Sequence, residues 1–317
     1  MPHVTTRRIG LIGHPVDHSR SPAMQQAAFD ALGLDIRYEL WDTPSSDLRK
    51  RMETLRLPGM LGANVTIPHK IAVIPYLDGR SSTARYLAGA VNTIVREETP
   101  HGVRLIGHNT DTTALLHVLD DQRVWQPGLR ALVLGAGGAA QAALGVTLLR
   151  GGQPWVAARK RSSARQALEA LYARREEARR ETSASSGAFP TGPVAGAPDH
   201  LKSYTLALSD ADALASALSE TRLLINATPI GTRDSQASPI PIDLLRRLPR
   251  DAFVFDLVYN PPETALVRAA HAVGLRATGG LSMLLYQGAE AFTLWTGHEA
   301  PLAVMRAALE ASLQTAG

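Results

Sequence analysis

Four short polar clusters hold the residue types that could move a proton or bind a polar ligand. The sharpest is N-V-T-I-P-H-K at residues 64–70. Alternation in an extended stretch places Asn64 and Thr66 on one side, and Pro68 turns the chain toward the next helix. Lys70 would then lie near the carboxyl end of a strand, where the ligands of α/β proteins collect. Lysines are mostly exposed, however, so this segment alone favours a solvated surface lysine.

The other three clusters also have simpler structural interpretations. Asn92 lies in an otherwise apolar segment, and Asp111 stands at a helix start, where capping the helix is its obvious role. Ser19 and Ser21 precede the first helix in H-S-R-S-P at residues 18–22. Two hydroxyl groups at this point can cap the helix or hold a carboxylate. Capping accounts for one serine but not for both.

The stretch L-V-L-G-A-G-G-A-A at residues 132–140 is typical of a dinucleotide-binding turn. An apolar run ends in G-x-G-x-x-A and opens a helix-like segment, which is the strand–turn–helix context that such a turn requires. The first glycine permits the tight turn, the second lets the backbone approach a pyrophosphate, and the helix start supplies unpaired N–H groups. The residues expected at the cofactor are Gly135, Ala136, Gly137, Gly138 and Ala139.

The charge after the next strand predicts which dinucleotide binds. In this fold an acidic residue there would bind a ribose 2′-hydroxyl, whereas an arginine accommodates a 2′-phosphate. The strand expected at residues 155–158 runs into R-K-R-S-S, with no Asp or Glu. Arginine also matches phosphate geometrically. We therefore expect NADP rather than NAD, with Arg159 and Lys160 at the phosphate.

Composition excludes several classes of protein. The 317 residues suggest two domains, and a hydrophobic fraction of 45% is ordinary for a globular protein. The absence of cysteine excludes disulfides, thiolate zinc sites and thiol nucleophiles, and fits a cytoplasmic location. No apolar run approaches the roughly 18–20 residues of a membrane span. The net charge of +4 comes without a basic, aromatic-interleaved stripe, so nucleic-acid binding is not expected.

Two further kinds of site are not expected. The histidines near the polar clusters lack metal-ligand spacing with carboxylates, and H-E-x-x-H does not occur, so we expect no metal site. No catalytic serine elbow occurs either.

Strands and helices alternate along the whole sequence, which predicts an α/β fold. Before the glycine turn, an αβ domain is expected to have strands at residues 9–12, 37–41, 63–67, 90–96 and 103–106, with helices at 22–32, 46–55 and 71–77. A helix at 109–121 would bridge two domains, with Asn109 at its start. A doubly wound sheet would follow, with strands at 131–134, 155–158, 205–208, 223–227 and 253–258. Residues 281–314 are expected to be helical, with a break near Gly297.

The polar motifs occur in the order found in the shikimate dehydrogenases, and the chain resembles that family over nearly its whole length. H-S-x-S-P, N-V-T-x-P-x-K, A-V-N-T and G-x-N-T-D come before the motif G-A-G-G-A in the middle of the sequence. N-A-T-P-I-G at 226–231, D-L-V-Y-N-P at 256–261, G-L-S-M-L-L-Y-Q-G at 280–288 and F-T-L-W-T-G at 292–297 continue the match. The chain departs from the family in A-R-K at 158–160, where Asn-Arg-Thr or Asn-Arg-Ser is common, and in P-I-G-T at 229–232, which lacks the usual methionine.

The resemblance implies a role for each matching position. Lys70 and Asp111 would form the catalytic pair, and Ser19 and Ser21 would hold the substrate carboxylate. The remaining substrate-binding positions would be Thr66, Asn92 and Gln287 at the ring hydroxyls, together with Asp111, with Asn64 in support and Tyr259 near the carboxylate and nicotinamide. The cofactor side would include Asn226, Thr228 and Gly280 besides the glycine turn. Asn109 resembles a scaffold residue instead.

The resemblance also implies the domain organisation. Residues 1–111 would form the substrate-binding catalytic domain, completed by C-terminal helices at 281–317, and residues 112–280 the NADP-binding Rossmann-like domain. Within the second domain, Glu176–Arg180 is an i,i+4 pair of a solvated helix end. It introduces a stretch rich in Gly, Pro, Ser and Ala, so we predict a flexible insertion at about 176–202.

The implied reaction is the reversible, NADP-dependent reduction of 3-dehydroshikimate to shikimate, on the route to chorismate and the aromatic amino acids. A lysine ammonium beside the ring oxygen can stabilise the alkoxide and deliver the proton, and a nearby carboxylate orients it. A quinate/shikimate dehydrogenase using NAD is one alternative. The presence of both Ser19 and Ser21 and the basic turn that begins at Arg159 count against it. A non-catalytic ligand sensor is another, opposed by the presence of both Lys70 and Asp111. Relatives are often dimers, which leaves a homodimer open.

Overall fold

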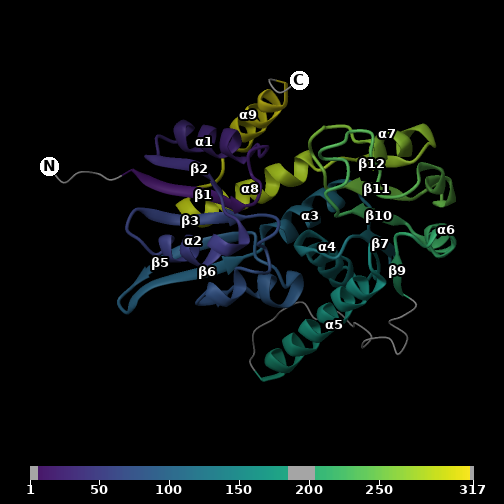
Figure 1. Cartoon of the computed structure of the whole chain (residues 1–317), viewed down its shortest axis with the longest axis horizontal. Helices are drawn as coiled ribbons and strands as arrows, with labels where there is room; N and C mark the ends of the chain where they lie inside the picture. The colour runs from purple at the N-terminus through teal and green to yellow at the C-terminus, as the bar shows by residue number, and fades with distance from the viewer. Residues whose placement is uncertain (1–5, 185–203, 315–317) are drawn as a thin grey trace. The chain divides into compact units, whose positions relative to one another are not determined.

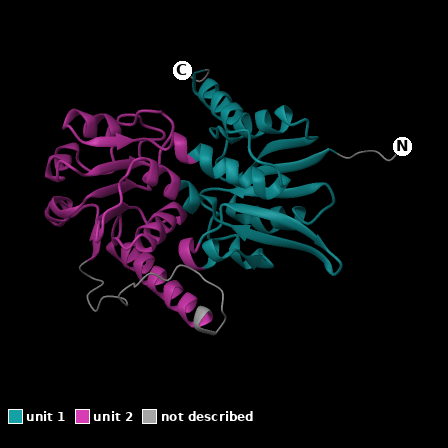
Figure 2. Ribbon diagram, turned by 180° about the vertical axis from the view of Figure 1, so that it is seen from behind, with its two compact units in different colours: residues 1–85, 90–114, 284–317 teal, residues 86–89, 115–283 magenta. Residues whose placement is uncertain are grey.

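The computed structural model describes residues 6–184 and 204–314, which divide into two compact units (Figures 1 and 2). Unit 1 comprises residues 1–85, 90–114 and 284–317, and unit 2 comprises residues 86–89 and 115–283. Three of the boundaries fall inside helical segments, namely the π-helical segment Thr83–Ala88, α3 (Thr110–Asp121) and α8 (Leu281–Thr296). The α/β fold class is confirmed.

Unit 1 is built on a mixed sheet with the strand order β2-β1-β3-β5-β6-β4. Its strands are β1 (Arg7–Gly13), β2 (Ile36–Asp42), β3 (Met60–Val65), β4 (Gly79–Arg80), β5 (Thr93–Thr99) and β6 (Gly102–His108). β1 pairs in parallel with both β2 and β3, whereas β5 runs antiparallel to β3 and β6. The segments that follow β1 and β3 therefore leave the sheet at the same edge. These segments carry the polar clusters at residues 18–22 and 64–70, which the sheet thus brings to one edge.

Helices cover this sheet with apolar side chains. Met52 of α2 (Leu48–Thr54) packs in one buried cluster with Ile12 of β1 and Trp41 of β2. Elsewhere in the unit, Phe29 of α1 (Ser21–Ala31) stacks on Phe292 of α8, with ring centroids 5.3 Å apart. Helix α9 (Leu302–Gln314) contacts α1. The C-terminal helices are thus part of the core of unit 1.

Unit 2 is a doubly wound parallel sheet. Its strands are β7 (Arg130–Leu134), β8 (Gln153–Ala158), β9 (Thr205–Ala207), β10 (Leu223–Asn226), β11 (Phe253–Asp256) and β12 (Arg276–Thr278). The order β12-β11-β10-β7-β8-β9, with every pair parallel, is that of the dinucleotide-binding fold. The order reverses between β7 and β10, and such a reversal is where ligands bind.

Four α-helices lie wholly within the described part of unit 2. They are α4 (Gly138–Leu149), α5 (Arg161–Ala184), α6 (Ala211–Glu220) and α7 (Ala265–Ala272). Side chains of α6 and α7 such as Leu214 and Leu266 pack with Leu132 and Leu224 of the sheet in one buried cluster. No helix in the described ranges is long and apolar enough to cross a membrane.

Several predicted elements are corrected by the structure. Residues 71–77 form turns and a single 3-10 turn, Ile74–Tyr76, because Pro75 lacks the N–H group that a longer helix would need. The strand expected from residue 90 begins at Thr93, so Asn92 precedes β5 and is not inside it. The short strands β4 and β12 and the π-helical segment Thr83–Ala88 were not predicted.

The first part of the predicted insertion lies within the described residues. Helix α5 continues through Ala184, and within it Arg180 Nε lies 3.4 Å from Glu176 Oε1, as expected for a helix end with i,i+4 pairs. The rest of the predicted insertion, residues 185–202, lies outside the described residues. The predicted helix break is confirmed, because Gly297, with φ of +71°, separates α8 from α9.

Candidate active site

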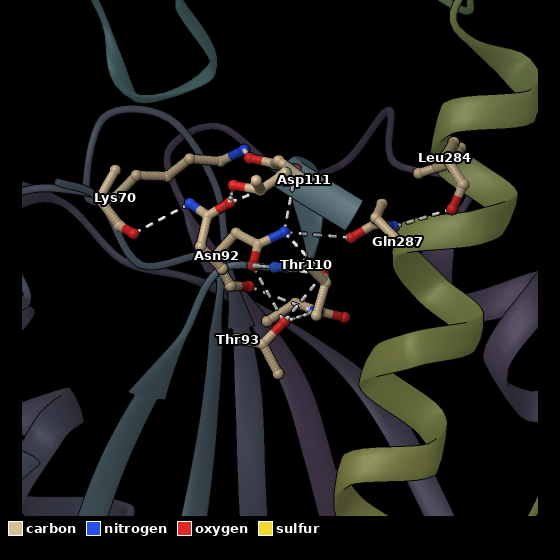
Figure 3. Close-up of polar contacts among 11 residues, drawn as sticks. Lys70, Asn92, Thr93, Thr110, Asp111, Leu284 and Gln287 are labelled. Carbon is tan, nitrogen blue, oxygen red and sulfur yellow. Dashed lines mark hydrogen bonds and ion pairs between the residues drawn. The ribbon is translucent and has the colours of Figure 1, made fainter. Parts of the chain in front are cut away.

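Lys70 and Asp111 form an ion pair in unit 1 (Figure 3). The Lys70 Nζ atom lies 2.6 Å from Asp111 Oδ2, and the two side chains are only 15% and 5% exposed. Lys70 follows β3 and Asp111 lies in the first turn of α3, so the fold joins residues 41 positions apart. The backbone carbonyl of Lys70 also accepts a hydrogen bond from the Val91 amide, at 2.7 Å. Lys70 is therefore not a solvated surface lysine.

Asn92 fixes the second oxygen of the Asp111 carboxylate. Its Nδ2 atom donates to Asp111 Oδ1 and to Thr110 Oγ1, both at 2.9 Å, and its Oδ1 atom accepts from the Thr110 amide at 2.8 Å. Asn92 is 2% exposed, and Thr93 Oγ1 donates to the same Oδ1 atom at 3.2 Å. The amide cannot turn over without losing these bonds, so it holds the carboxylate in one orientation.

Gln287 brings helix α8 to this cluster (Figure 3). Its Oε1 atom lies 3.5 Å from Asn92 Nδ2, and its Nε2 atom donates to the Leu284 carbonyl of its own helix at 2.9 Å. The structure thus places Gln287 beside Asn92 and Asp111, although it lies far from them in the sequence.

Asn64 is held entirely by neighbouring residues of unit 1. Tyr38 Oη donates to Asn64 Oδ1 at 2.7 Å, and Asn64 Nδ2 donates to Thr93 Oγ1 at 3.1 Å and to the Asn92 carbonyl at 3.3 Å. The residue is 4% exposed. Both hydrogens of its amide are in use, which suits the supporting role expected for it better than direct contact with a ligand.

The remaining substrate candidates of unit 1 lie after the parallel strands β1 and β3. Ser19 Oγ accepts a hydrogen bond at 3.2 Å from the amide of Ser21, the first residue of α1. The Thr66 amide donates to the Ile12 carbonyl at 2.8 Å, which ties the turn after β3 to the end of β1. Ser19 and Thr66 are partly exposed, and Ser21 is buried.

Asn109 is a scaffold residue, as predicted. Its Oδ1 atom accepts from the Thr112 amide at 3.0 Å and from the Thr112 hydroxyl at 2.8 Å, so it caps α3. Its Nδ2 atom donates to the Ala90 carbonyl at 2.9 Å. Because Asn109 does the capping, Asp111 is released from that role.

Residues beside the predicted set complete the cluster. Thr93 and Thr110 hold Asn92, and Tyr38 holds Asn64. Both threonines directly follow an asparagine within the motifs A-V-N-T and G-x-N-T-D, and that was the available signal. His69, beside Lys70, is 1% exposed, and its Nε2 atom lies 2.6 Å from the Thr43 carbonyl. This contact joins the segment after β3 to the segment after β2.

The glycine turn of unit 2 has the geometry of a phosphate-binding turn. Gly135, with φ of +113°, follows β7, and its amide donates to the Ala157 carbonyl at 2.8 Å. Gly137 precedes α4 with no side-chain cap, and a Cβ atom there would meet no atom within 4 Å. The space beside Gly137, at the start of α4, is therefore open, as an approaching pyrophosphate requires. Ala136, Gly138 and Ala139 complete the turn and are partly exposed.

Arg159 and Lys160 directly follow β8 and are exposed. Within the described residues neither forms an ion pair. β8 pairs with β7, whose last residue precedes the glycine turn, so the two cations leave the sheet beside that turn. An exposed arginine at this place fits a 2′-phosphate.

Asn226 and Asp256 organise the ends of the neighbouring strands. They are register partners at the ends of β10 and β11, and Asn226 Nδ2 donates to Asp256 Oδ1 at 2.8 Å. Asn226 Oδ1 accepts from the Thr228 hydroxyl at 2.7 Å, and Asp256 Oδ2 accepts from Thr264 Oγ1 at 2.6 Å. Burial raises the pKa of Asp256, although hydrogen bonds from Thr264, Val258 and Asn226 oppose the rise. Asn226 is fully buried, and its bonds to Asp256 and Thr228 shape the loop after β10.

Two predicted residues lie in the segments after β11 and β12. Tyr259 is partly exposed in the segment after β11. The Gly280 amide donates to the Val258 carbonyl at 2.9 Å, and a Cβ atom at Gly280 would lie 2.2 Å from the Leu257 carbonyl oxygen. Only glycine allows this approach of the two segments.

No group of three or more His, Cys, Asp or Glu side chains that could hold a metal ion occurs among the described residues.

Two family models match the chain at the two ends of the sequence. The shikimate dehydrogenase substrate binding domain matches residues 11–94, and the shikimate 5′-dehydrogenase C-terminal domain matches residues 280–310. The first match contains Lys70 and Asn92, and the second contains Gln287.

Known proteins resemble the chain over almost its full length. A shikimate dehydrogenase (NADP(+)) from Symbiobacterium thermophilum is 41% identical over 308 residues, covering 97% of this chain and 95% of the relative. The structure of shikimate 5-dehydrogenase from Thermus thermophilus in complex with NADP(H) and shikimate has a TM-score of 0.75 at 36% identity, covering 97% of this chain and 100% of that chain. Quinate dehydrogenase from Corynebacterium glutamicum in complex with NAD has a TM-score of 0.75 at 28% identity, covering 96% and 99%. The chain therefore belongs to the shikimate dehydrogenase family.

Proposed function

We propose that the protein is an NADP-dependent shikimate dehydrogenase, which reversibly reduces the ring ketone of 3-dehydroshikimate to the hydroxyl group of shikimate. The observation that carries the proposal is the contact between Lys70 Nζ and Asp111 Oδ2 at 2.6 Å, in a cluster whose other members are polar. The NADP-dependent relative and the shikimate complex of the same fold support the choice of substrate and cofactor.

The proposed chemistry uses Lys70 as the proton donor during reduction. Bound NADPH supplies the hydride that reaches the carbonyl carbon. The Lys70 ammonium group stabilises the negative charge that develops on the carbonyl oxygen and gives that oxygen a proton. Asp111 holds the ammonium group in place, and Asn92 keeps the carboxylate from rotating. In the oxidation of shikimate the same pair takes the proton back.

The polar cluster also provides groups for the substrate. We assign the substrate carboxylate to Ser19 and Ser21 and the ring hydroxyls to Thr66, Asn92, Asp111 and Gln287. Asn64 supports these residues through its bonds to Asn92 and Thr93. A small polyhydroxylated acid suits this set, because hydroxyl and amide groups bind hydroxyls by paired hydrogen bonds and reject an analogue that lacks them.

The cofactor assignment rests on unit 2. Residues 135–139 would hold the pyrophosphate with backbone N–H groups, and Arg159 with Lys160 would hold the 2′-phosphate. The segment at Asn226 and Thr228 follows β10, which pairs with the strand before the glycine turn, and it would line the nicotinamide side. Gly280, whose amide donates to the Val258 carbonyl after β11, would belong to the same side.

The decisive experiment measures initial rates of oxidation of shikimate and of quinate, each with NADP and with NAD. We expect shikimate with NADP to give the highest kcat/KM. Preference for quinate with NAD would instead assign the activity of the quinate dehydrogenases. Binding of shikimate without turnover under all four conditions would make the protein a ligand sensor.

A further inference from the structure

Glu290 of helix α8 has a half-buried carboxyl group with no role in the mechanism above. It lies three residues after Gln287, which is about one helical turn along the same face of α8. Its Oε2 atom is shielded from solvent and has no hydrogen-bond partner. Buried side-chain oxygens are nearly always hydrogen-bonded, so an exception beside a candidate active site calls for an explanation.

The surroundings of Glu290 connect it to the Lys70–Asp111 pair. Thr113, two residues after Asp111 on α3, hydrogen-bonds to the Glu290 carboxyl group, and the charge of Asp111 acts on it directly. Three further groups of unit 1 that hydrogen-bond to α8 are uncharged, namely Asn92 at Gln287, Gln25 of α1 at Gly288 and the Ile94 carbonyl of β5 at Trp295. Among the described residues, Asp111 is the charged group that acts on Glu290, and Asp111 is itself paired with Lys70.

The pKa of Glu290 lies in the pH range in which enzymes work. Burial raises the pKa of Glu290 to about 7, the charge of Asp111 adds to the rise, and Thr113 opposes it. Asp111 has already divided its two oxygens between Lys70 and Asn92. Loss of the Glu290 proton therefore adds a second negative charge to a site that holds one carboxylate and one ammonium group.

We propose that Glu290 is a positioning residue for the catalytic pair, whose ionised carboxyl group holds the proton on Lys70 by adding negative charge next to Asp111. A negative neighbour favours the protonated form of an amine. An ionised Glu290 thus assists reduction of the ketone, because reduction needs the proton on Lys70. It opposes oxidation of shikimate, because oxidation needs Lys70 to be able to accept a proton. This inference rests on the proposed function, because it assumes that the Lys70–Asp111 pair transfers the proton.

The test is the pH profile of shikimate oxidation by the Glu290→Gln variant. Glutamine keeps the shape of the side chain and an acceptor for Thr113 but cannot ionise. We expect the acidic limb of the kcat profile, whose midpoint belongs to the coupled pair, to move to lower pH by roughly half a unit. On that limb, oxidation would be about threefold faster than in the wild type at the same pH. Glu310→Gln, at an exposed position of α9, is the matched control and should leave the profile in place.

A second variant keeps the test independent of how well Glu290→Gln folds. Thr113→Val removes the hydroxyl group that lowers the pKa of Glu290, so the carboxyl group stays neutral to higher pH. We expect a shift in the same direction as for Glu290→Gln, but a smaller one. Unchanged profiles in both variants, or a rate reduced equally at every pH, would overturn the inference. Turnover of shikimate by the wild type is measured first, so failure of the proposed function is seen separately.

Discussion

Asp111 divides its carboxylate between an ammonium group and an amide, and this division sets what Lys70 can do. Oδ2 is 2.6 Å from Lys70 Nζ, and Oδ1 is 2.9 Å from Asn92 Nδ2. Removing either partner of a buried ion pair leaves the other charge uncompensated, so both residues are needed at once. The arrangement is suited to holding a proton at one place until a carbonyl oxygen arrives.

We predict that Lys70→Met and Asp111→Asn each lower kcat for shikimate oxidation by roughly 10²–10⁴-fold, with a much smaller change in KM. The reason is that proton transfer is a property of the transition state and adds little to ground-state binding. Steady-state kinetics measure the effect, and Lys50→Met, at an exposed position of α2, is the control. A loss carried mainly by KM would assign the pair to substrate binding instead.

Arg159 is predicted to discriminate between the two cofactors. Its guanidinium group is exposed directly after β8, where it can bind a 2′-phosphate. Arg159→Ala should raise KM for NADP by roughly tenfold and leave KM for NAD almost unchanged, since NAD lacks that phosphate. An equal rise for both cofactors would show that Arg159 acts on the shared part of the dinucleotide or on the fold.

Glu290 makes a prediction for stability as well as for catalysis. Burial raises its pKa to about 7 from an ordinary 4.5, so the folded protein binds this proton more tightly than the unfolded chain. The resulting stability is complete below the ordinary pKa and is lost as the pH rises through about 7. Glu290→Gln removes that loss, so its free energy of unfolding relative to wild type should increase by roughly 2 kcal/mol between acidic pH and pH ~8.

Urea denaturation of both proteins across this pH range measures the difference. The Glu310→Gln protein should follow the wild-type curve throughout, because its side chain is exposed. Parallel curves for Glu290→Gln and wild type would mean that Glu290 titrates as an ordinary surface carboxyl group.

At the scale of the element, the two outer glycines of G-A-G differ in what they do. Gly135 has φ of +113°, and a Cβ atom there would lie 3.0 Å from the Ala227 carbonyl oxygen. Gly137 has φ of −81° and free space around a Cβ atom. The first glycine is therefore required by the fold, whereas the second is required only when a ligand approaches.

We accordingly predict opposite outcomes for two alanine variants. Gly135→Ala should lower the free energy of unfolding by roughly 1–3 kcal/mol, because alanine is strained at positive φ. Gly137→Ala should fold with unchanged stability but bind NADP more weakly, since its methyl group occupies the approach to the N–H groups of α4. Thermal unfolding and NADP titration separate the two effects. Destabilisation by Gly137→Ala, or none by Gly135→Ala, would contradict this division of roles.

Local patterns predicted the elements that hold the site, and long-range contacts explain what they missed. The run before Gly135 and the break at Gly297 are local signals, and both elements occur where expected. The helix expected at residues 71–77 was wrong, because Pro75 outweighs the apolar pattern around it. β12 has only three residues and is a strand because β11 pairs with it.

The candidate site shows the same limit. Lys70 alone favoured a surface lysine, and only the motif order of a family indicated its partner. The bonds of Asn92 to Thr110 and of Asn64 to Tyr38 join elements far apart in the sequence, and no local periodicity predicts them. Glu290 carried no signal, because a glutamate within a helical segment is usually solvated.

At the scale of the whole molecule, the protein builds two sheets of different kinds. Unit 1 has a mixed sheet completed by the C-terminal segment, and unit 2 has the fully parallel, doubly wound sheet. The candidates for substrate binding lie in unit 1 apart from Tyr259, and the candidates for the cofactor lie in unit 2. Each ligand should then stabilise mainly the unit that supplies its contacts.

Hydrogen exchange tests this separation on the intact protein. Shikimate alone should slow amide exchange at residues 91–93 and 109–112, whereas NADP alone should slow it at 135–141 and 226–230, because bound ligand suppresses the local openings through which amides exchange. NAD is the informative control, since it should protect the glycine turn equally well and leave residues 159–163 less protected than NADP does. Protection of residues 109–112 by NADP, with the glycine turn unchanged, would place the cofactor in the wrong unit. That pattern would overturn the cofactor assignment even in a protein that still oxidises shikimate.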